Sequence, residues 1–334
     1  MRTSFAGLAL AAAGMLAAPA AEAQNYPFRD ITTVVVWGAG GGTDVINRMF
    51  MAEMERHLPV SITVTNITGG VAGSNGMVHV MNQPADGYTL AGIADSNVTA
   101  AVQGGFPHRF DYWHPYIIGG SPGVLSVNAD APWQTLEELI AAAQEAPGTI
   151  PAGASGSGSI HHLNLIALEQ GTDTSFRFVP YPGSAPAQEA AVTGEVQVIA
   201  TSLAEQQALI QGGQIRPLAM LVPEEAEIAG MTIPSAFDSF PQLDGFLPLR
   251  QMLGFAVPSE SPAEVIEVLT EAFEAAIEEP AVADWAANNF YTIAGVHGAE
   301  AQALFAGHES KFAWALHELG IATVDPASLD IPQP

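Results

Sequence analysis

One local pattern recurs in this chain and restricts the folds open to it: a short apolar strand, a turn rich in glycine, and then a helix. In the first copy, residues 31–36 are rich in Val, Ile and Thr, which predicts a buried strand. The turn 38–42 is mostly glycine, so its backbone N–H groups are accessible to a ligand. Thr43 or Asp44 then caps a helix. Because a helix N-terminus offers free N–H groups and a positive dipole end, this turn suits a small anion; a purely structural turn is the equally weighted alternative.

The same device returns further along the chain. Turns rich in glycine or serine lie between predicted strands and helices near 38–43, 69–76, 153–159 and 182–185. Their order predicts parallel strands with right-handed crossovers, and ligands bind at such turns, at the carboxyl ends of the strands. Two α/β domains with these turns along a shared cleft form a venus-flytrap binding protein. Longer helices are expected over about 262–278 and 298–320.

The first residues have the pattern of a secretory signal. Arg2 precedes an apolar run over residues 5–18, and residues 21–23 (Ala-Glu-Ala) place small side chains where a signal peptidase cleaves. Residues 1–23 are therefore predicted to be a cleavable signal peptide, with the mature chain starting near Gln24 in the periplasm. A transmembrane anchor is disfavoured because the apolar core is too short. The chain has no cysteine, which excludes a disulfide framework and a lipid-anchored cysteine.

The charge of the chain excludes several functions. Its formal net charge is −26 at pH 7, which argues against nucleic-acid binding through phosphate neutralisation. We interpret the acidity as adaptation to a salt-rich habitat, where screening removes self-repulsion. Lysine occurs once, at Lys311, so the glycine-rich turns have no lysine for a phosphate loop or a Schiff base. No cofactor is expected.

Three motifs permit other functions but fit them poorly. The segment 38–43 approaches the dinucleotide fingerprint G-x-G-x-x-G, yet Thr43 stands where Gly or Ala is needed. The serine-rich loop 153–159 suggests a hydrolase, although no register gives the G-x-S-x-G nucleophile elbow. His161 and His162 are adjacent, so on a helix they point about 100° apart and do not readily share a metal. The sequence therefore predicts no catalytic residue and no metal site.

Several segments, in order, resemble the motifs of one family. They are Gly40-Gly41-Gly42-Thr43-Asp44, preceded by Trp37-Gly38 where the family usually has Pro-Phe or Pro-Tyr; Asn66 to Gly73; Ala85 to Leu90; Gly153 to Leu163, ending in His-Leu; Val179 to Ala187, with Pro182 in place of the usual lysine; and Leu203 to Met220. These segments are similar to motifs of the periplasmic substrate-binding proteins of tripartite tricarboxylate transporters, the TctC or Bug family. The resemblance covers nearly the whole mature chain.

The resemblance implies a type II periplasmic-binding-protein fold, with two α/β domains and a ligand cleft between them. Residues 24–125 and 251–334 are expected to form a discontinuous first domain, and residues 126–250 the second. The ligands of the family are usually small organic anions, including di- and tricarboxylates, acidic amino acids and aromatic carboxylates.

The resemblance also implies a set of site residues. Loops 38–43 and 181–185 are expected to clamp a carboxylate, which agrees with the N–H and hydroxyl donors that the turns offer. The His-Leu motif places the family histidine on His162. The candidate ligand-binding residues are Gly38, Ala39, Gly40, Gly41, Gly42, Thr43, Asp44, Ser96, Asn97, Ser155, Ser157, Ser159, His162, Tyr181, Gly183, Ser184, Ala185, Thr201 and Ser202.

These features together predict a non-enzymatic extracytoplasmic receptor. We expect a monomer that binds a small organic carboxylate and delivers it to the membrane permease subunits of a tripartite tricarboxylate-type transporter. Two alternatives stay open: a secreted serine hydrolase that uses the loop 153–159, and a solute-sensing module for signalling.

Overall fold

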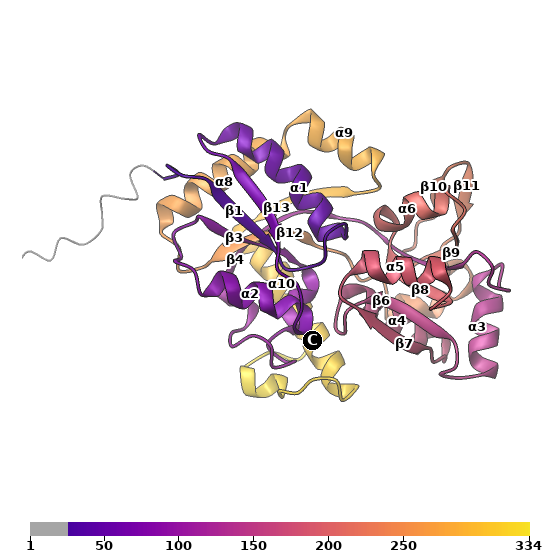
Figure 1. The fold of residues 1–334 in the computed structure, drawn as a ribbon. Helices are drawn as coiled ribbons and strands as arrows, with labels where there is room; N and C mark the ends of the chain where they lie inside the picture. The colour runs from indigo at the N-terminus through magenta and orange to yellow at the C-terminus, as the bar shows by residue number, and fades with distance from the viewer. Residues whose placement is uncertain (1–25) are drawn as a thin grey trace, which may run out of the picture.

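The computed structural model describes residues 26–334, so the predicted signal peptide 1–23 lies outside the described residues. Two lobes, each built around its own β-sheet, stand side by side in Figure 1. The predicted α/β fold with two domains is confirmed. No helix in the described part of the chain is long and apolar enough to cross a membrane.

The first lobe holds a mixed six-stranded sheet in the order β13-β4-β12-β3-β1-β2. Its strands are β1 (Ile31–Val35), β2 (Ile62–Asn66), β3 (Thr89–Ala94), β4 (Trp113–Gly120), β12 (Leu253–Pro258) and β13 (Thr292–His297). As predicted, β1 pairs in parallel with β2 and β3. The other half of the sheet is not parallel: β12 runs antiparallel to both β3 and β4, because the chain returning from the second lobe enters this sheet at the end where it left.

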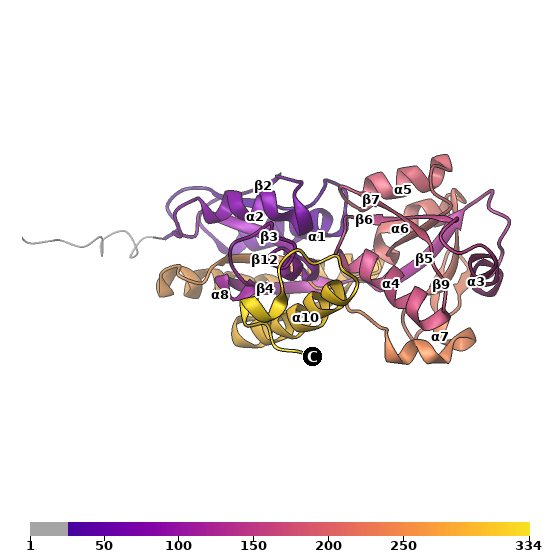
Figure 2. The same cartoon turned by 90° about the horizontal axis from the view of Figure 1, so that it is seen from below.

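The second lobe holds a five-stranded sheet in the order β7-β6-β8-β5-β9 (Figure 2). Its strands are β5 (Gly123–Asn128), β6 (Pro151–Ser155), β7 (Arg177–Tyr181), β8 (Val198–Ser202) and β9 (Ile215–Met220), beside a hairpin of β10 (Ala226–Ile228) and β11 (Met231–Ile233). The expected turn 153–159 begins too early, because residues 153–155 belong to β6. A Cβ on Gly153 would lie 3.1 Å from the Val196 side chain, so this closely packed strand requires small residues. Glycine and serine are also typical of loops, and for this reason the sequence predicted a turn here.

Helices cover both faces of each sheet. They are α1 (Gly42–Met54), α2 (Ser74–Met81), α3 (Leu136–Glu145), α4 (Ile160–Thr172), α5 (Ser184–Thr193), α6 (Leu203–Gln211), α7 (Ala236–Ser239), α8 (Ala263–Ile277), α9 (Pro280–Asn288) and α10 (Gly298–Glu318). In the first lobe α2 and α10 pack on one apolar cluster, and α1, α8 and α9 on another. In the second lobe α3 and α4 share one cluster, and α5 and α6 the other. Strands β8 and β12 are buried along their whole length, as expected for strands covered on both faces.

Two connections join the lobes. The chain leaves the first sheet after Gly120, enters the second at Gly123, and returns before β12. The connections touch, since a Cβ on Gly120 would lie 2.0 Å from the carbonyl oxygen of Gln251. They are also bonded, because the Ser121 N–H donates to Gln251 Oε1 at 3.0 Å. Strand pairing places residues 123–125, which the sequence assigned to the first domain, in the second sheet.

Candidate functional site

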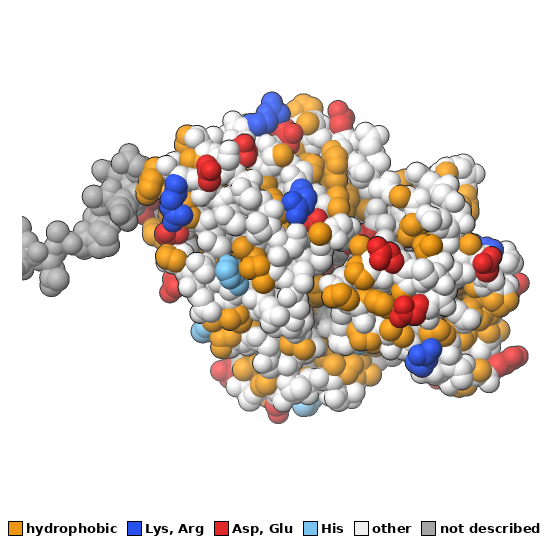
Figure 3. Space-filling view, in the orientation of Figure 1, with side chains coloured by type: hydrophobic (Ala, Val, Ile, Leu, Met, Phe, Trp, Pro, Cys, Tyr) orange, Lys and Arg blue, Asp and Glu red, His pale blue; other side chains and the backbone are white. Residues whose placement is uncertain are grey.

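Four helices begin at the junction of the lobes. α1 starts at Gly42 in the first lobe, and α4, α5 and α6 start at Ile160, Ser184 and Leu203 in the second. The first turn of a helix leaves N–H groups without helical partners, so donors gather around one small pocket. Its free volume is about 30 Å³, room for about two water molecules. On the face shown in Figure 3, hydrophobic side chains gather along the junction. Because the cavity volume is only about 30 Å³, a larger solute requires the lobes to separate.

About half of the predicted site residues line this pocket. They are Gly38, Gly41, Gly42, Thr43, Ser96, Ser155, Ser159, Gly183 and Ser184. Most come from the predicted turns near 38–43, 153–159 and 182–185, which the fold brings together from both lobes. The turn 69–76 contributes no lining residue.

The remaining predicted residues do not line the pocket. They are Ala39, Gly40, Asp44, Asn97, Ser157, His162, Tyr181, Ala185, Thr201 and Ser202. Several bond within their own lobe: the Asn97 amide donates to the Ala72 carbonyl at 2.6 Å, and the Tyr181 hydroxyl donates to Glu195 at 2.9 Å. The Thr201 hydroxyl accepts from a glutamine amide of α5 at 3.2 Å. These side chains stabilise the walls of the site.

Asp44 shapes the first glycine turn. Its Oδ2 accepts from the Gly40 N–H at 2.9 Å and from Arg48 Nε at 3.0 Å, and its Oδ1 accepts from the Asn66 amide at 2.8 Å. Burial on its own would raise the pKa of Asp44, but these hydrogen bonds and the Arg48 charge lower it below the ordinary value of 3.8. The ionised carboxylate therefore holds the turn from which α1 starts.

The histidine at the pocket is His161, the neighbour of the predicted residue. His161 Nε2 lies 3.1 Å from Glu205 Oε2. The His162 ring instead stacks on Phe178 with centroids 3.8 Å apart, and its Nδ1 accepts from the Gly158 N–H at 3.1 Å. Burial lowers the pKa of His162 to about 4, so it is neutral at pH 7 and fixes the loop before α4. Adjacent helical residues point about 100° apart, and the packing of α4 turns His161 to the pocket.

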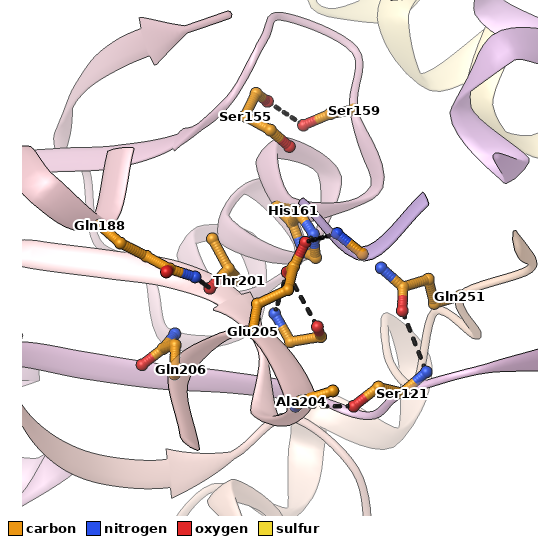
Figure 4. A network of polar contacts seen from close by, with 12 residues as sticks. Ser121, Ser155, Ser159, His161, Gln188, Thr201, Ala204, Glu205, Gln206 and Gln251 are labelled. Atoms are coloured by element: carbon orange, nitrogen blue, oxygen red, sulfur yellow. Dashed lines mark hydrogen bonds and ion pairs between the residues drawn. The ribbon is translucent and has the colours of Figure 1, made fainter. Parts of the chain in front are cut away.

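Glu205, from α6, is the carboxylate that lines the pocket (Figure 4). Its Oε1 accepts from the N–H of Gly42, the first residue of α1 in the other lobe, at 2.7 Å. Its Oε2 accepts from the N–H and the hydroxyl of Ser202 at 2.9 and 2.8 Å. Burial would raise the pKa of Glu205, but His161 and the backbone donors outweigh that effect and lower the pKa to about 2. Glu205 is therefore ionised at pH 7 and joins the two lobes.

Two residues that line the pocket, Trp37 and His161, each have a buried nitrogen without a partner among the described residues: Trp37 Nε1 and His161 Nδ1. An unpaired buried polar group costs about 1–3 kcal/mol, so a bound solute or water that satisfies these atoms gains by doing so. None of the residues that line the pocket is lysine or arginine. An anion bound here depends on N–H groups, hydroxyls, the indole and helix dipoles.

Sequence reasoning missed part of the lining. The missed residues are Trp37, Ala94, Ile160, His161, Glu205, Gln251 and Leu253. The segment Ser202-x-x-Glu205 matches a capping box, and the structure contains that box. The motif explains the bond to Ser202 and gives no sign that the same carboxylate reaches the other lobe.

The described residues contain neither a metal-binding cluster nor a hydrogen-bonded pair of a loop serine and a histidine side chain. Within residues 26–334, no group of three or more His, Asp or Glu side chains is placed to hold a metal ion. The Ser159 hydroxyl donates to the Ser155 carbonyl and accepts from the His162 N–H, so it caps α4. Among the described hydrogen bonds, neither the Ser155 nor the Ser157 hydroxyl pairs with a histidine.

Comparison with known proteins identifies relatives over most of the chain. A family model described as "Tripartite tricarboxylate transporter family receptor" matches residues 46–311. A UPF0065 protein in the tcbD-tcbE intergenic region of Pseudomonas sp. (strain P51) is 30% identical over 305 residues, covering 85% of this chain and 84% of the relative. Protein BugT of Bordetella pertussis is 30% identical over 221 residues, covering 64% of this chain and 67% of BugT.

Solved structures share the fold. A periplasmic transporter matches with a TM-score of 0.81 at 25% identity, covering 89% of this chain and 99% of the other. MatC (Rpa3494) from Rhodopseudomonas palustris, solved with bound malate, matches with a TM-score of 0.78 at 22% identity, covering 87% and 100%. Rpa4515 from R. palustris, solved with adipate, matches with a TM-score of 0.77 at 23% identity, covering 89% and 99%.

Proposed function

Because this chain belongs to the tripartite tricarboxylate transporter receptor family, we propose that it is an extracytoplasmic receptor for a small organic carboxylate. It holds the solute between its lobes and delivers it to the permease subunits of a membrane transporter. In this proposal residues 1–23 are a cleaved signal peptide, the mature protein is a periplasmic monomer, and it catalyses no reaction.

The observation that carries the proposal is the pocket between the lobes, where helix N-termini and hydroxyls converge and no lysine or arginine is present. We place the carboxylate of the solute against the turn at Gly183 and Ser184, where α5 begins, and against the unpartnered Trp37 Nε1–H. Helix N-termini favour anions. Two proteins of the same fold were solved with malate and with adipate, which supports a small carboxylate as the ligand.

Binding is coupled to closure of the lobes. The pocket is too small for a carboxylate of several carbons, and the lobes are joined by two touching connections at Ser121 and Gln251. Paired connections of this kind form a hinge. The lobes open about these connections, admit the solute, and close to replace water with fixed donors.

A ligand screen tests the proposal. Purified mature protein is screened by thermal shift against mono-, di- and tricarboxylates, including malate and adipate, and each hit is titrated calorimetrically. We expect at least one acid to bind with a micromolar or lower Kd, which corresponds to about −8 kcal/mol or better. A screen in which no carboxylate stabilises the protein would contradict the proposal.

Two glycine substitutions locate the binding site. A Cβ on Gly183 would lie 3.4 Å from the Gly38 backbone of the opposite lobe, so Gly183→Leu holds the lobes apart and is expected to weaken binding more than tenfold. Gly307 in α10 has no atom within 4 Å of an added Cβ, and Gly307→Leu serves as the control. Equal affinity of the two variants would show that the solute binds elsewhere.

A further inference from the structure

Glu205 accepts a hydrogen bond from a backbone N–H of the first glycine turn, which the sequence predicted to bind the ligand. It extends from α6 in the second lobe to the Gly42 N–H, the first N–H of α1 in the first lobe, at 2.7 Å. Its side chain is 4% exposed. The anion site predicted at the first glycine turn is thus occupied by a carboxylate of the protein itself.

The two oxygens of Glu205 differ in how many hydrogen bonds they accept. Oε2 accepts from the N–H and the hydroxyl of Ser202 and faces His161 Nε2, so its acceptor capacity is used. Among residues 26–334, Oε1 accepts from the Gly42 N–H alone, and a carboxylate oxygen has two acceptor sites. One acceptor site on Oε1 is therefore left at the pocket. It matches a hydrogen-bond donor on the solute.

Among the described residues that line the pocket, no free cation is left for a second carboxylate. His161 is the positively ionisable side chain that lines the pocket, and Glu205 already engages it. Arg48 is occupied by Asp44 and Asn66 at the outer side of the turn. A carboxylate placed against Glu205 would therefore meet a buried like charge, which is destabilising where screening is weak.

We propose that Glu205 is a specificity-determining residue. It admits solutes that present one carboxylate together with a hydrogen-bond donor, such as an amide, hydroxyl or ammonium group, and it discriminates against dicarboxylates. The donor of the solute binds Glu205 Oε1, and its carboxylate binds the remaining N–H donors of the pocket. This inference rests on the proposed carboxylate-receptor function.

Matched ligand pairs test the inference. Adipate and its monoamide adipamate have nearly the same shape, as do succinate and succinamate, and each pair differs in one carboxylate. By calorimetric titration we expect the wild-type protein to bind at least one of the monoamides at least tenfold tighter than the matching dicarboxylate. This ratio of the two affinities is measured on the wild-type protein, so the test does not depend on whether a variant folds.

Glu205→Gln removes the charge and keeps the shape. It is expected to reduce the preference for the monoamide at least tenfold, because the new amide donates to a carboxylate. Glu189 is an exposed residue of α5 in the same lobe, and Glu189→Gln controls for the loss of one negative charge; its ratio should equal that of the wild type. A wild-type preference for dicarboxylates, or an unchanged ratio in Glu205→Gln, would overturn the inference and leave the receptor function standing. Failure of every carboxylate to bind would overturn both.

Discussion

The buried pair of His161 and Glu205 predicts a large coupling energy between two residues of the second lobe. Their side chains are 5% and 4% exposed, and the facing nitrogen and oxygen are 3.1 Å apart. When His161 is protonated, unit charges at this distance attract by about 5 kcal/mol at an effective dielectric constant of about 20. That figure omits the cost of burying both charges, which offsets much of the attraction.

The pKa of Glu205 gives a separate value for the contribution of its ionised carboxylate to folding stability. The pKa of Glu205 is about 2, against an ordinary value of 4.5. At about 1.4 kcal/mol per pKa unit, ionised Glu205 contributes about 3 kcal/mol to folding. Because the pKa is depressed in the folded state, this contribution is fully present above pH 4.5 and is lost as the pH falls toward 2. The acid-dependent loss of stability in this range should be smaller in Glu205→Gln than in the wild type.

A double-mutant cycle measures the pair directly. His161→Asn, Glu205→Gln and the double variant are unfolded in urea at pH 7, followed by circular dichroism and tryptophan fluorescence, whose transitions must coincide for a two-state treatment. We expect a coupling energy of about 2–3 kcal/mol. The exposed pair of Arg29 and Asp86, 54% and 41% exposed, is the control and should give less than about 1 kcal/mol. A coupling below about 0.5 kcal/mol for the buried pair would refute the reasoning.

Two further predictions concern stability. Burial raises the pKa of Asp95 to about 7, above its ordinary 3.8, so stability present below pH 3.8 is lost as the pH rises toward 7. Asp95→Asn should therefore gain up to about 4 kcal/mol relative to the wild type between pH 4 and pH 8 in urea unfolding; a difference that does not change with pH would contradict this. Gly254→Ala places a Cβ 1.9 Å from the Tyr116 carbonyl oxygen in β4 and should destabilise the protein by about 1–3 kcal/mol or more. In the same assay, Gly307→Ala on the open face of α10 should stabilise it by about 0.5–1 kcal/mol. The reasoning fails if the two alanines have equal effects.

The family resemblance and the fold class are confirmed, and several individual elements were predicted from local signals. The strand expected over 31–36 is observed as β1, and the helix expected over 262–278 is observed as α8. Both have a strong apolar period or a clear bounding turn, which depends only on nearby residues. Strands β4 and β13 were not predicted. β4 contains a proline and two glycines, and β13 is a half-exposed edge strand containing a glycine, so pairing with distant strands stabilises them.

The candidate site was predicted in outline. The three turns that line the pocket were identified because glycine and serine at a strand–helix junction offer backbone donors whatever the rest of the fold does. What the pattern could not predict is which donors stay free. Gly42 donates to a residue 163 positions away, and no local signal marks that contact.

The amino-acid sequence by itself determined the strand–turn–helix units, because these follow from periodicity and turn chemistry within about a dozen residues. The order of its motifs along the chain carried the resemblance to the family and to its two-lobed fold. Only the tertiary structure decided that His161 faces the pocket while His162 stacks on Phe178, and that Glu205 occupies the first donor of α1. The physical reason is that packing against the rest of the lobe sets the rotation of each helix and the distance between lobes. Those two quantities determine which charges meet in the pocket.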